Sequence, residues 1–113
     1  MKRLSREKGF EFMLTVYPWA HQVSDTEWVP GRFMLMTQDA RPSDVSLNTV
    51  QALSAASGIE LLDLFPVFKS YQGEEPLYFA HDMHWTPAGN ALVARGYEEF
   101  LSEKLLPHLC AKP

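Results

Sequence analysis

The stretch FAHDMHWTPAGNALVA, residues 79–94, places an acid and a histidine one residue apart, just before a typical helix start. Thr86 can cap that helix, and Pro87 fits its first position, where a missing N–H costs nothing. Residues two apart point away from each other on a helix but share a side in an extended or turn segment. Because the predicted helix begins after His84, the side chains of Asp82 and His84 can meet.

The helix that follows carries one apolar stripe and is expected to end at Pro107. The stripe consists of Leu92, Val93, Tyr97, Phe100, Leu101 and Leu105. Gly89 and Gly96 fall along its edge, where the absence of a side chain would permit close approach to a sheet. We therefore expect this helix to pack against strands.

Further upstream, β-branched and aromatic residues predict two strands, over Glu11–Tyr17 and Ile59–Leu64, and Ser43–Ser57 is predicted as an amphipathic helix between them. Strand, helix, strand and helix is the order expected of a parallel sheet with helices packed on it. We expect one small α/β domain over residues 1–113, with a short, mostly parallel sheet and a long C-terminal helix.

Shorter segments complete the predicted order of elements. We expect a helix end over Arg3–Lys8 closed by Gly9, and we expect Ser43 or Asp44 to cap the middle helix and Gly58 to end it. Extended pieces are expected over Arg32–Thr37 and Leu77–Phe79, and a short helix over Phe65–Tyr71.

Composition excludes several classes of protein. The formal net charge of −4 and the isoelectric point near 5.5 leave no basic stripe, so we expect no nucleic-acid partner. No apolar run is long enough to cross a bilayer and no signal peptide is recognisable, so neither a membrane partner nor export is expected. The single cysteine, Cys110, cannot form an internal bridge and fits a reducing compartment. As written, the chain is expected to be cytoplasmic, without a cofactor.

An Asp-x-His pair of this kind has a definite chemistry. A carboxylate that accepts the Nδ1–H of an imidazole fixes its tautomer and leaves Nε2 free as a base. Groups that act on ligands in parallel α/β folds collect at the carboxyl ends of strands, just ahead of helices. Asp82 and His84 thus supply two of the three members of a nucleophilic triad.

The block HDMHWTPAGN, residues 81–90, resembles the C-terminal block of SGNH (GDSL-like) hydrolases. It is most similar to the D-x-H-W-T version found in hydrolase-like and alginate acetyltransferase-like members. MLTVYPWAHQV (13–23) and GIELLDLFPVF (58–68) resemble the two strand segments that precede this block. The resemblance implies a three-layer, flavodoxin-like α/β sandwich and ester hydrolysis or acyl transfer at a serine. It also implies that Asp82 is the acid and His84 the base, and that Trp85 shapes the substrate site.

The resemblance covers only part of the family pattern. The Gly-Asp-Ser block with the nucleophile is absent, as are the glycine and asparagine blocks that supply oxyanion donors. The chain therefore resembles the C-terminal third to half of such an enzyme. The serines that could substitute as nucleophile are Ser24, Ser43, Ser46, Ser54 and Ser57, none of which stands in a comparable motif. We expect little esterase activity from the chain alone.

A fold that lacks its first strands would leave an open strand edge and apolar surface. We expect either a homo-oligomer or a serine-bearing partner to cover them. For the homo-oligomer, the expected interface is the segment from Trp19 to Pro42, with Trp19, Trp28, Phe33, Met34 and Met36.

Three interpretations of the chain stay open at this point. It is the histidine-bearing portion of an ester hydrolase or acyltransferase, a non-enzymatic oligomeric binding module, or a self-sufficient hydrolase with an unusual serine. For the pair itself, the alternatives are a network that only caps the helix and a divalent metal site that also uses His81. No further metal ligands are recognisable, so we expect no metal.

Overall fold

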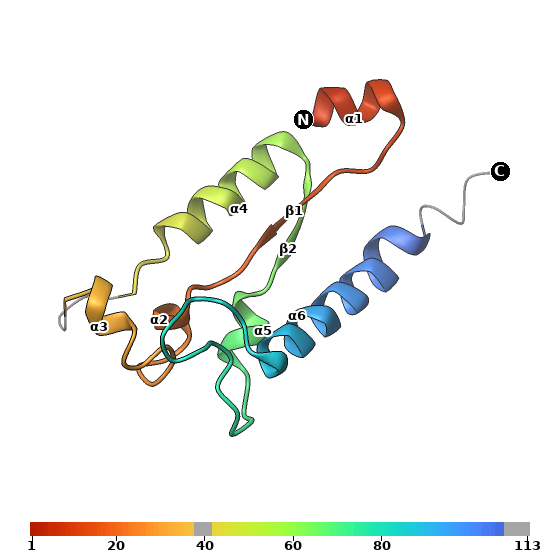
Figure 1. The fold of residues 1–113 in the computed structure, drawn as a ribbon. Helices are drawn as coiled ribbons and strands as arrows, with labels where there is room; N and C mark the ends of the chain where they lie inside the picture. The colour runs from red at the N-terminus through yellow and green to blue at the C-terminus, as the bar shows by residue number, and fades with distance from the viewer. Residues whose placement is uncertain (38–41, 108–113) are drawn as a thin grey trace.

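A computed structural model describes residues 1–37 and 42–107 (Figure 1). Its elements are α1 (Lys2–Lys8), β1 (Met13–Val16), α2 (Ala20–Val23), α3 (Arg32–Leu35), α4 (Val45–Ser57), β2 (Glu60–Asp63), α5 (Phe65–Lys69), α6 (Pro87–Phe100) and the π-helical segment η1 (Leu101–Leu105). The predicted role of Cys110 lies outside the described residues.

The two strands form a parallel sheet, and the helix α4 makes the crossover between them. Met13 is opposite Glu60, and Val16 is opposite Asp63. α4 contacts both strands, while α6 contacts β2 and lies on the other side of the sheet (Figure 1). This arrangement of helix, strands and helix confirms the predicted partial α/β fold with a short parallel sheet and a C-terminal helix.

The core lies between the carboxyl ends of the strands and the first half of α6. Its buried apolar residues are Ala20, Trp28, Leu62, Leu64, Phe68, Leu77, Tyr78, Leu92 and Val93. Burying a large apolar side chain contributes about 1.5–3 kcal/mol relative to leaving it exposed. The core therefore ties the start of α6 and the segment before it to both strands.

The start of α6 follows the prediction closely. The Thr86 hydroxyl accepts a hydrogen bond from the Gly89 N–H at 3.2 Å, and Pro87 occupies the first position. A Cβ on Gly96 would come within 2.5 Å of Leu64, directly after β2, so the predicted close approach to the sheet is confirmed there. At Gly89 the close neighbour is instead the Leu77 carbonyl oxygen, which would lie 2.3 Å from a Cβ at that position.

Glycines end the first two long helical segments, as their sequences predict. Gly9 after α1 and Gly58 after α4 both adopt left-handed backbone angles, with φ of 70° and 58°. At the other end of α4, the Ser43 hydroxyl accepts a hydrogen bond from the Val45 N–H at 3.3 Å, whereas the Asp44 side chain makes no capping bond.

The prediction of an extended segment over Arg32–Thr37 is wrong, because Arg32–Leu35 forms the short helix α3. The N–H groups of Phe33 and Met34 donate to the carbonyls of Pro30 and Gly31. Arg32 is buried and donates to the carbonyls of Ser24 and Asp25, which fixes the first turn. An apolar run of this length is typical of a strand, but here its side chains are exposed on a single helical turn.

The apolar face predicted for α4 is not buried. Among the residues of α4 none is buried, and Val45 and Leu53 are 70% and 56% exposed. Two four-residue strands offer little surface to a helix of 13 residues. β1 is likewise only half-buried along its length.

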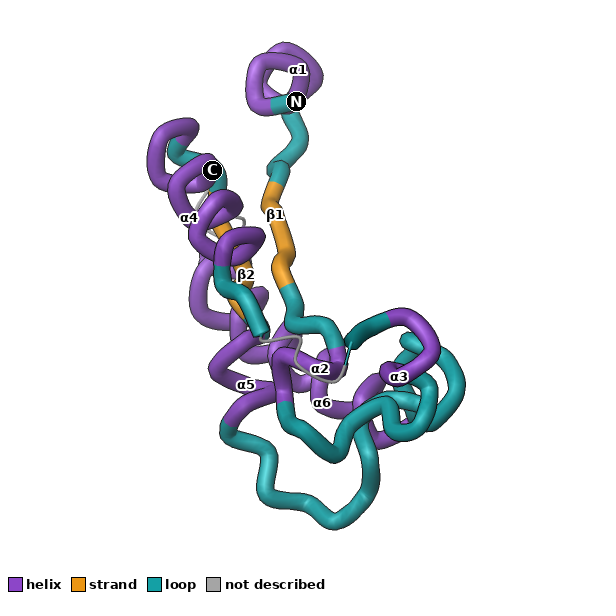
Figure 2. The backbone as a smooth tube through the Cα atoms, turned by 90° about the vertical axis from the view of Figure 1, so that its left-hand side faces the viewer, coloured by secondary structure: helices purple, strands orange, loops and turns teal. Residues whose placement is uncertain are grey.

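Among residues 1–37 and 42–107, β1 has a strand neighbour on one edge only (Figure 2). Within the described part of the chain, the sheet contains β1 and β2 alone, so the second edge of β1 carries backbone groups that no strand pairs. No helix among the described residues has both the length and the apolar character needed to span a bilayer.

Candidate functional site

The segment 77–86 folds back on itself as a hairpin in front of α6. The Thr86 N–H donates to the Leu77 carbonyl at 3.0 Å, and the Phe79 N–H donates to the His84 carbonyl at 3.1 Å. Tyr78 and Trp85 pair between these two bonds as an antiparallel bridge. We call residues 77–86 the site hairpin, because it carries the predicted acid and base, Asp82 and His84, near its tip.

Asp82 and His84 contact each other within the site hairpin. Nδ1 of His84 lies 2.9 Å from Oδ1 of Asp82, and the His84 backbone N–H donates to the same oxygen at 2.6 Å. The predicted contact between the two side chains is therefore confirmed. The backbone N–H of His84 holds the pKa of Asp82 below its usual value, and the imidazole acts in the same direction.

This contact determines which ring nitrogen is available for chemistry. A carboxylate only accepts hydrogen bonds, so the proton of the neutral imidazole lies on Nδ1. Nε2 then carries a lone pair that can take up a proton. The His84 side chain is 87% exposed, which leaves Nε2 accessible to a substrate or to a second protein segment.

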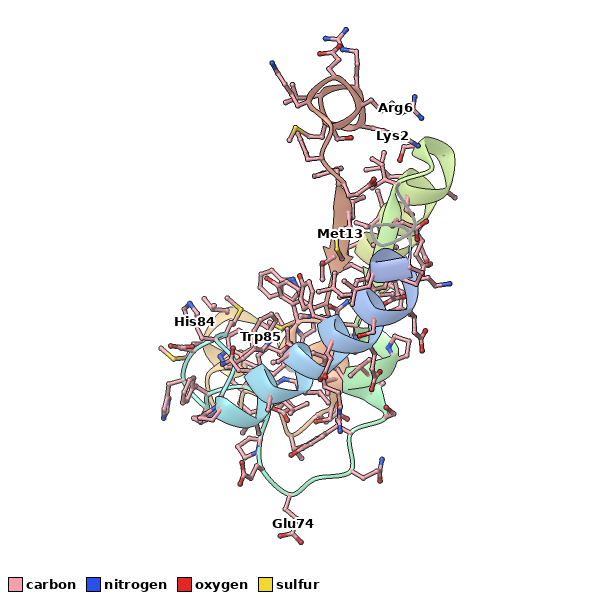
Figure 3. The ribbon with its side chains drawn as sticks, turned by 90° about the vertical axis from the view of Figure 1, so that its right-hand side faces the viewer. Lys2, Arg6, Met13, Glu74, His84 and Trp85 are labelled. Carbon is pink, nitrogen blue, oxygen red and sulfur yellow. The ribbon has the colours of Figure 1, made fainter. Side chains whose placement is uncertain are left out.

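A pocket of about 390 Å³ lies beside His84, at the carboxyl end of β1. Its lining comes from the strand end, the loop after it and the site hairpin, and consists of Thr15, Val16, Tyr17, Pro18, Trp19, Ala20, Tyr78, Met83 and His84. A larger pocket of about 570 Å³ lies at the opposite end of the strands, next to α1. Figure 3 shows Lys2 and Arg6, which line that pocket, far from His84. In parallel α/β sheets ligands bind at the carboxyl ends, so the pocket beside His84 is the better candidate.

Trp85 lies next to His84 (Figure 3). It is not among the residues that line this pocket. Its ring packs edge-on against Tyr17, with centroids 4.8 Å apart, and contacts the Phe68 ring in a tilted arrangement at 6.2 Å. Tyr17 does line the pocket, so Trp85 packs against a residue of the pocket wall. Direct contact between Trp85 and a substrate stays a prediction.

No serine lines the pocket beside His84 in the described part of the chain. The lining contains one hydroxyl other than those of Tyr17 and Tyr78, that of Thr15, which pairs with the Tyr97 hydroxyl at 2.7 Å. The candidate serines make other contacts. Hydrogen bonds join Ser24 to Thr26 and Glu27, and Ser43 to Val45. The hydroxyls of Ser54 and Ser57 donate to the carbonyls of Ile59 and of Leu53 in α4, and Ser46 lines a different pocket with Trp19, His21 and Gln22.

The described residues include no group of three or more histidine, cysteine, aspartate or glutamate side chains placed to hold a metal ion. His81 belongs to the site hairpin, and it is exposed. Asp82 and His84 contact each other, and Nε2 of His84 is accessible.

Sequence reasoning did not find several residues that form the surroundings of the pair. Tyr17 and Trp19 line the pocket, and their position directly after β1 is the signal that could have identified them. The buried carboxylate of Glu27 accepts hydrogen bonds from the N–H groups of Leu77 and Tyr78. No motif surrounds Glu27 in the sequence, so only the fold reveals this contact.

The family described as "SGNH hydrolase-like domain, acetyltransferase AlgX" matches residues 1–112. Searches of curated proteins and of solved structures found no significant match. The matched segment contains both strands, the site hairpin and α6, so the chain belongs to the family of SGNH hydrolase-like domains of the acetyltransferase AlgX type.

Proposed function

We propose that Asp82 and His84 are the acid and base of a serine-dependent acyl-transfer site, and that the serine comes from a segment or chain outside these 113 residues. The observation that carries the proposal is the 2.9 Å contact between Nδ1 of His84 and Oδ1 of Asp82, which leaves Nε2 accessible. Membership of an acetyltransferase family supports the reaction class.

The reaction would proceed in two steps, acylation of the serine and then transfer of the acyl group. The serine Oγ bonds to the ester carbonyl carbon while its proton passes to Nε2 of His84, and Nε2 then gives that proton to the leaving alcohol as its C–O bond breaks. In the second step the hydroxyl of an acceptor, or water, attacks the acyl-serine and loses its proton to Nε2. The serine regains that proton as the acyl group leaves. Asp82 stabilises the imidazolium in both steps.

The free edge of β1 supports a place for the missing serine. The pocket beside His84 is lined by the end of β1 and the loop after it, so a strand added to that edge would end beside the pocket. A serine at the carboxyl end of such a strand could come within the roughly 3 Å of Nε2 that proton transfer needs. This geometry supports a serine-bearing strand as the complement of the chain.

The test is hydrolysis of p-nitrophenyl acetate by the chain alone and by the chain co-expressed with the serine-bearing segment of another domain of the same family. We expect hydrolysis only from the combination, with a loss of about 10²–10⁴-fold in kcat for His84→Ala. His81→Ala, a neighbouring histidine of the site hairpin, is the matched control and should retain the activity. Full activity in the His84→Ala combination would sink the proposal, and activity of the chain alone that His84→Ala abolishes would point to a serine of its own.

A non-enzymatic oligomeric module is the second candidate, and exposed apolar side chains favour it. Phe33, Met34 and Leu35 on α3 are 53%, 79% and 72% exposed, and Trp19 is 53% exposed. Trp28, in contrast, is only 4% exposed within the chain's own core, so it is not available to the interface expected from the sequence.

Light scattering at micromolar concentration tests this second candidate. If it holds, the chain forms a dimer or larger assembly, and Met34→Lys weakens it because it places a charge in an apolar contact. A monomer at this concentration contradicts the oligomeric module. The acyl-transfer proposal does not depend on this outcome.

A further inference from the structure

We propose that Glu27 is a positioning residue that fixes the site hairpin, and through it the contact between Asp82 and His84. The inference rests on the proposed function, since it assigns Glu27 a role at that same site. Glu27 acts at a distance from the pair, because its carboxylate binds the base of the hairpin and not its tip.

The carboxylate of Glu27 holds the first arm of the site hairpin by two hydrogen bonds. Oε1 accepts from the Leu77 N–H at 2.9 Å, and Oε2 accepts from the Tyr78 N–H at 3.0 Å. Glu27, Leu77 and Tyr78 are all buried. Hydrogen bonds to a charged group are about twice as strong as those between neutral groups, so the carboxylate is a firm polar anchor for the hairpin base.

The loop that carries Glu27 is itself fixed. The Glu27 N–H donates to the Ser24 hydroxyl at 3.2 Å, and the buried guanidinium of Arg32 donates to the Ser24 and Asp25 carbonyls at 3.2 and 3.0 Å. The same loop makes a second contact with the hairpin, because the Gly31 N–H donates to the Ala80 carbonyl at 2.8 Å. A polar network therefore connects α3 to the site hairpin on both sides of Phe79.

The pair itself has little other support. The side chains of Asp82 and His84 are 57% and 87% exposed, so no surrounding core holds their rotamers. Their contact depends on the backbone path from Ala80 to His84, which the bond from the His84 N–H to Asp82 holds at the tip and which the anchored base of the hairpin orients. A group that fixes the base of the hairpin thus controls how often Nδ1 of His84 meets Asp82.

The two adjacent N–H groups explain why the anchor is a carboxylate. Each needs an acceptor, and a carboxylate offers one oxygen to each. A glutamine offers a single oxygen and turns its NH₂ group toward the second N–H, which leaves a buried donor unpaired. Glu27→Gln therefore preserves size while removing one of the two hydrogen bonds that hold the first arm of the hairpin.

The readout is the tautomer of His84 in the folded chain, measured from the ring ¹⁵N shifts in long-range ¹H–¹⁵N spectra of the selectively labelled protein. In the wild type the Nδ1–H form should dominate, because Asp82 accepts that proton. We expect Glu27→Gln to reduce the Nδ1–H population by roughly half, together with shifts of the Leu77 and Tyr78 amide signals. Global destabilisation does not change the tautomer of the molecules that remain folded.

Asp63→Asn is the matched control. It changes the net charge equally, and it also alters a carboxylate that accepts a backbone N–H, because Oδ1 of Asp63 accepts from the Phe65 N–H at 2.9 Å. The other oxygen of Asp63 accepts from the Gln51 side chain on α4, away from the site hairpin. The His84 tautomer should stay as in the wild type. A loss of the Nδ1–H form in this control equal to that in Glu27→Gln would overturn the specific role of Glu27.

An unchanged tautomer in folded Glu27→Gln would also overturn the proposal. If that variant does not fold, Ser24→Ala takes its place, because it keeps the carboxylate but removes the acceptor for the Glu27 N–H. It should shift the tautomer in the same direction by a smaller amount, and no shift at all would be decisive against the role. These measurements need no substrate and no serine, so the positioning role and the acyl-transfer function can fail independently.

Discussion

Oδ1 of Asp82 accepts two hydrogen bonds from His84, one from its backbone N–H at 2.6 Å and one from Nδ1 at 2.9 Å. The first bond fixes the turn and the second fixes the imidazole, so one oxygen sets both the backbone and the tautomer. Both side chains are exposed, so the geometry of the pair forms without a covering segment.

The two hydrogen bonds that Asp82 accepts from His84 predict that the stability of the chain depends on pH. The folded state lowers the pKa of Asp82, first through the His84 N–H, so the folded form binds this proton less readily than the unfolded form. The contribution to stability is fully present above the usual value of 3.8 and is lost as the pH falls through the lower folded-state pKa. The His84 amide signal should titrate with a midpoint below 3.8. A midpoint at or above this value would contradict the two-bond geometry.

Asp82→Asn should separate positioning from binding in the assembled acyl-transfer site. The amide can present its NH₂ group to Nδ1, which favours the wrong tautomer, so we expect kcat to fall by about 10²–10⁴-fold with KM nearly unchanged. Initial rates with p-nitrophenyl acetate at several concentrations give kcat and KM separately. A rise in KM without loss of kcat would assign Asp82 to substrate binding instead.

Local patterns are sufficient to predict the elements whose signals lie within a few residues. Thr86 and Pro87 mark the start of α6, Gly58 marks the end of α4, and the Asp-x-His spacing predicts the contact at the site. These features depend on short-range hydrogen bonds and backbone angles, which neighbouring residues determine.

The errors come from contacts that the sequence does not encode locally. Whether Arg32–Thr37 is extended or helical depends on the anchoring of Arg32 to carbonyls seven and eight residues away. Whether the face of α4 is buried depends on how many strands the sheet has. The contact between Glu27 and Leu77 spans 50 residues and leaves no periodic signal, so only the folded chain reveals it.

Gly89→Ala should destabilise the chain although alanine is the better helix former. A Cβ at this position would lie 2.3 Å from the Leu77 carbonyl oxygen and 3.0 Å from Cβ of Trp85, so α6 and the site hairpin would have to separate. The expected loss is about 1–3 kcal/mol of unfolding free energy, measured by urea denaturation. Ala91→Gly, at an exposed position of the same helix, should cost about 1 kcal/mol through helix propensity alone. If Gly89→Ala stabilised the chain, the close contact would not exist.

Tyr78→Phe should weaken the core next to the site. The buried Tyr78 hydroxyl donates to the Pro18 carbonyl, and burial raises the pKa of Tyr78 to about 12, so the hydroxyl remains a donor at neutral pH. Removing it leaves a buried carbonyl without its partner, at a cost of about 1–3 kcal/mol. Tyr97→Phe removes the more accessible bond to Thr15 and should cost less, about 0.5–1.5 kcal/mol. Equal losses in the two variants would show that the Pro18 contact has no special weight.

His21 should make the chain less stable in mild acid. Its Nδ1 is buried and has no hydrogen-bond partner among the described residues, and burial, followed by the charge of Arg32, lowers its pKa below 6.5. Between the lowered value and 6.5 the unfolded chain binds a proton at His21 that the folded chain does not, so the unfolding free energy falls as the pH is lowered through this window. His21→Asn retains a polar atom near the position of Nδ1 but does not titrate. Denaturation at pH values on either side of 6.5 should therefore show a smaller loss of unfolding free energy in the variant than in the wild type. Identical losses would mean that His21 is protonated equally in the folded and the unfolded chain.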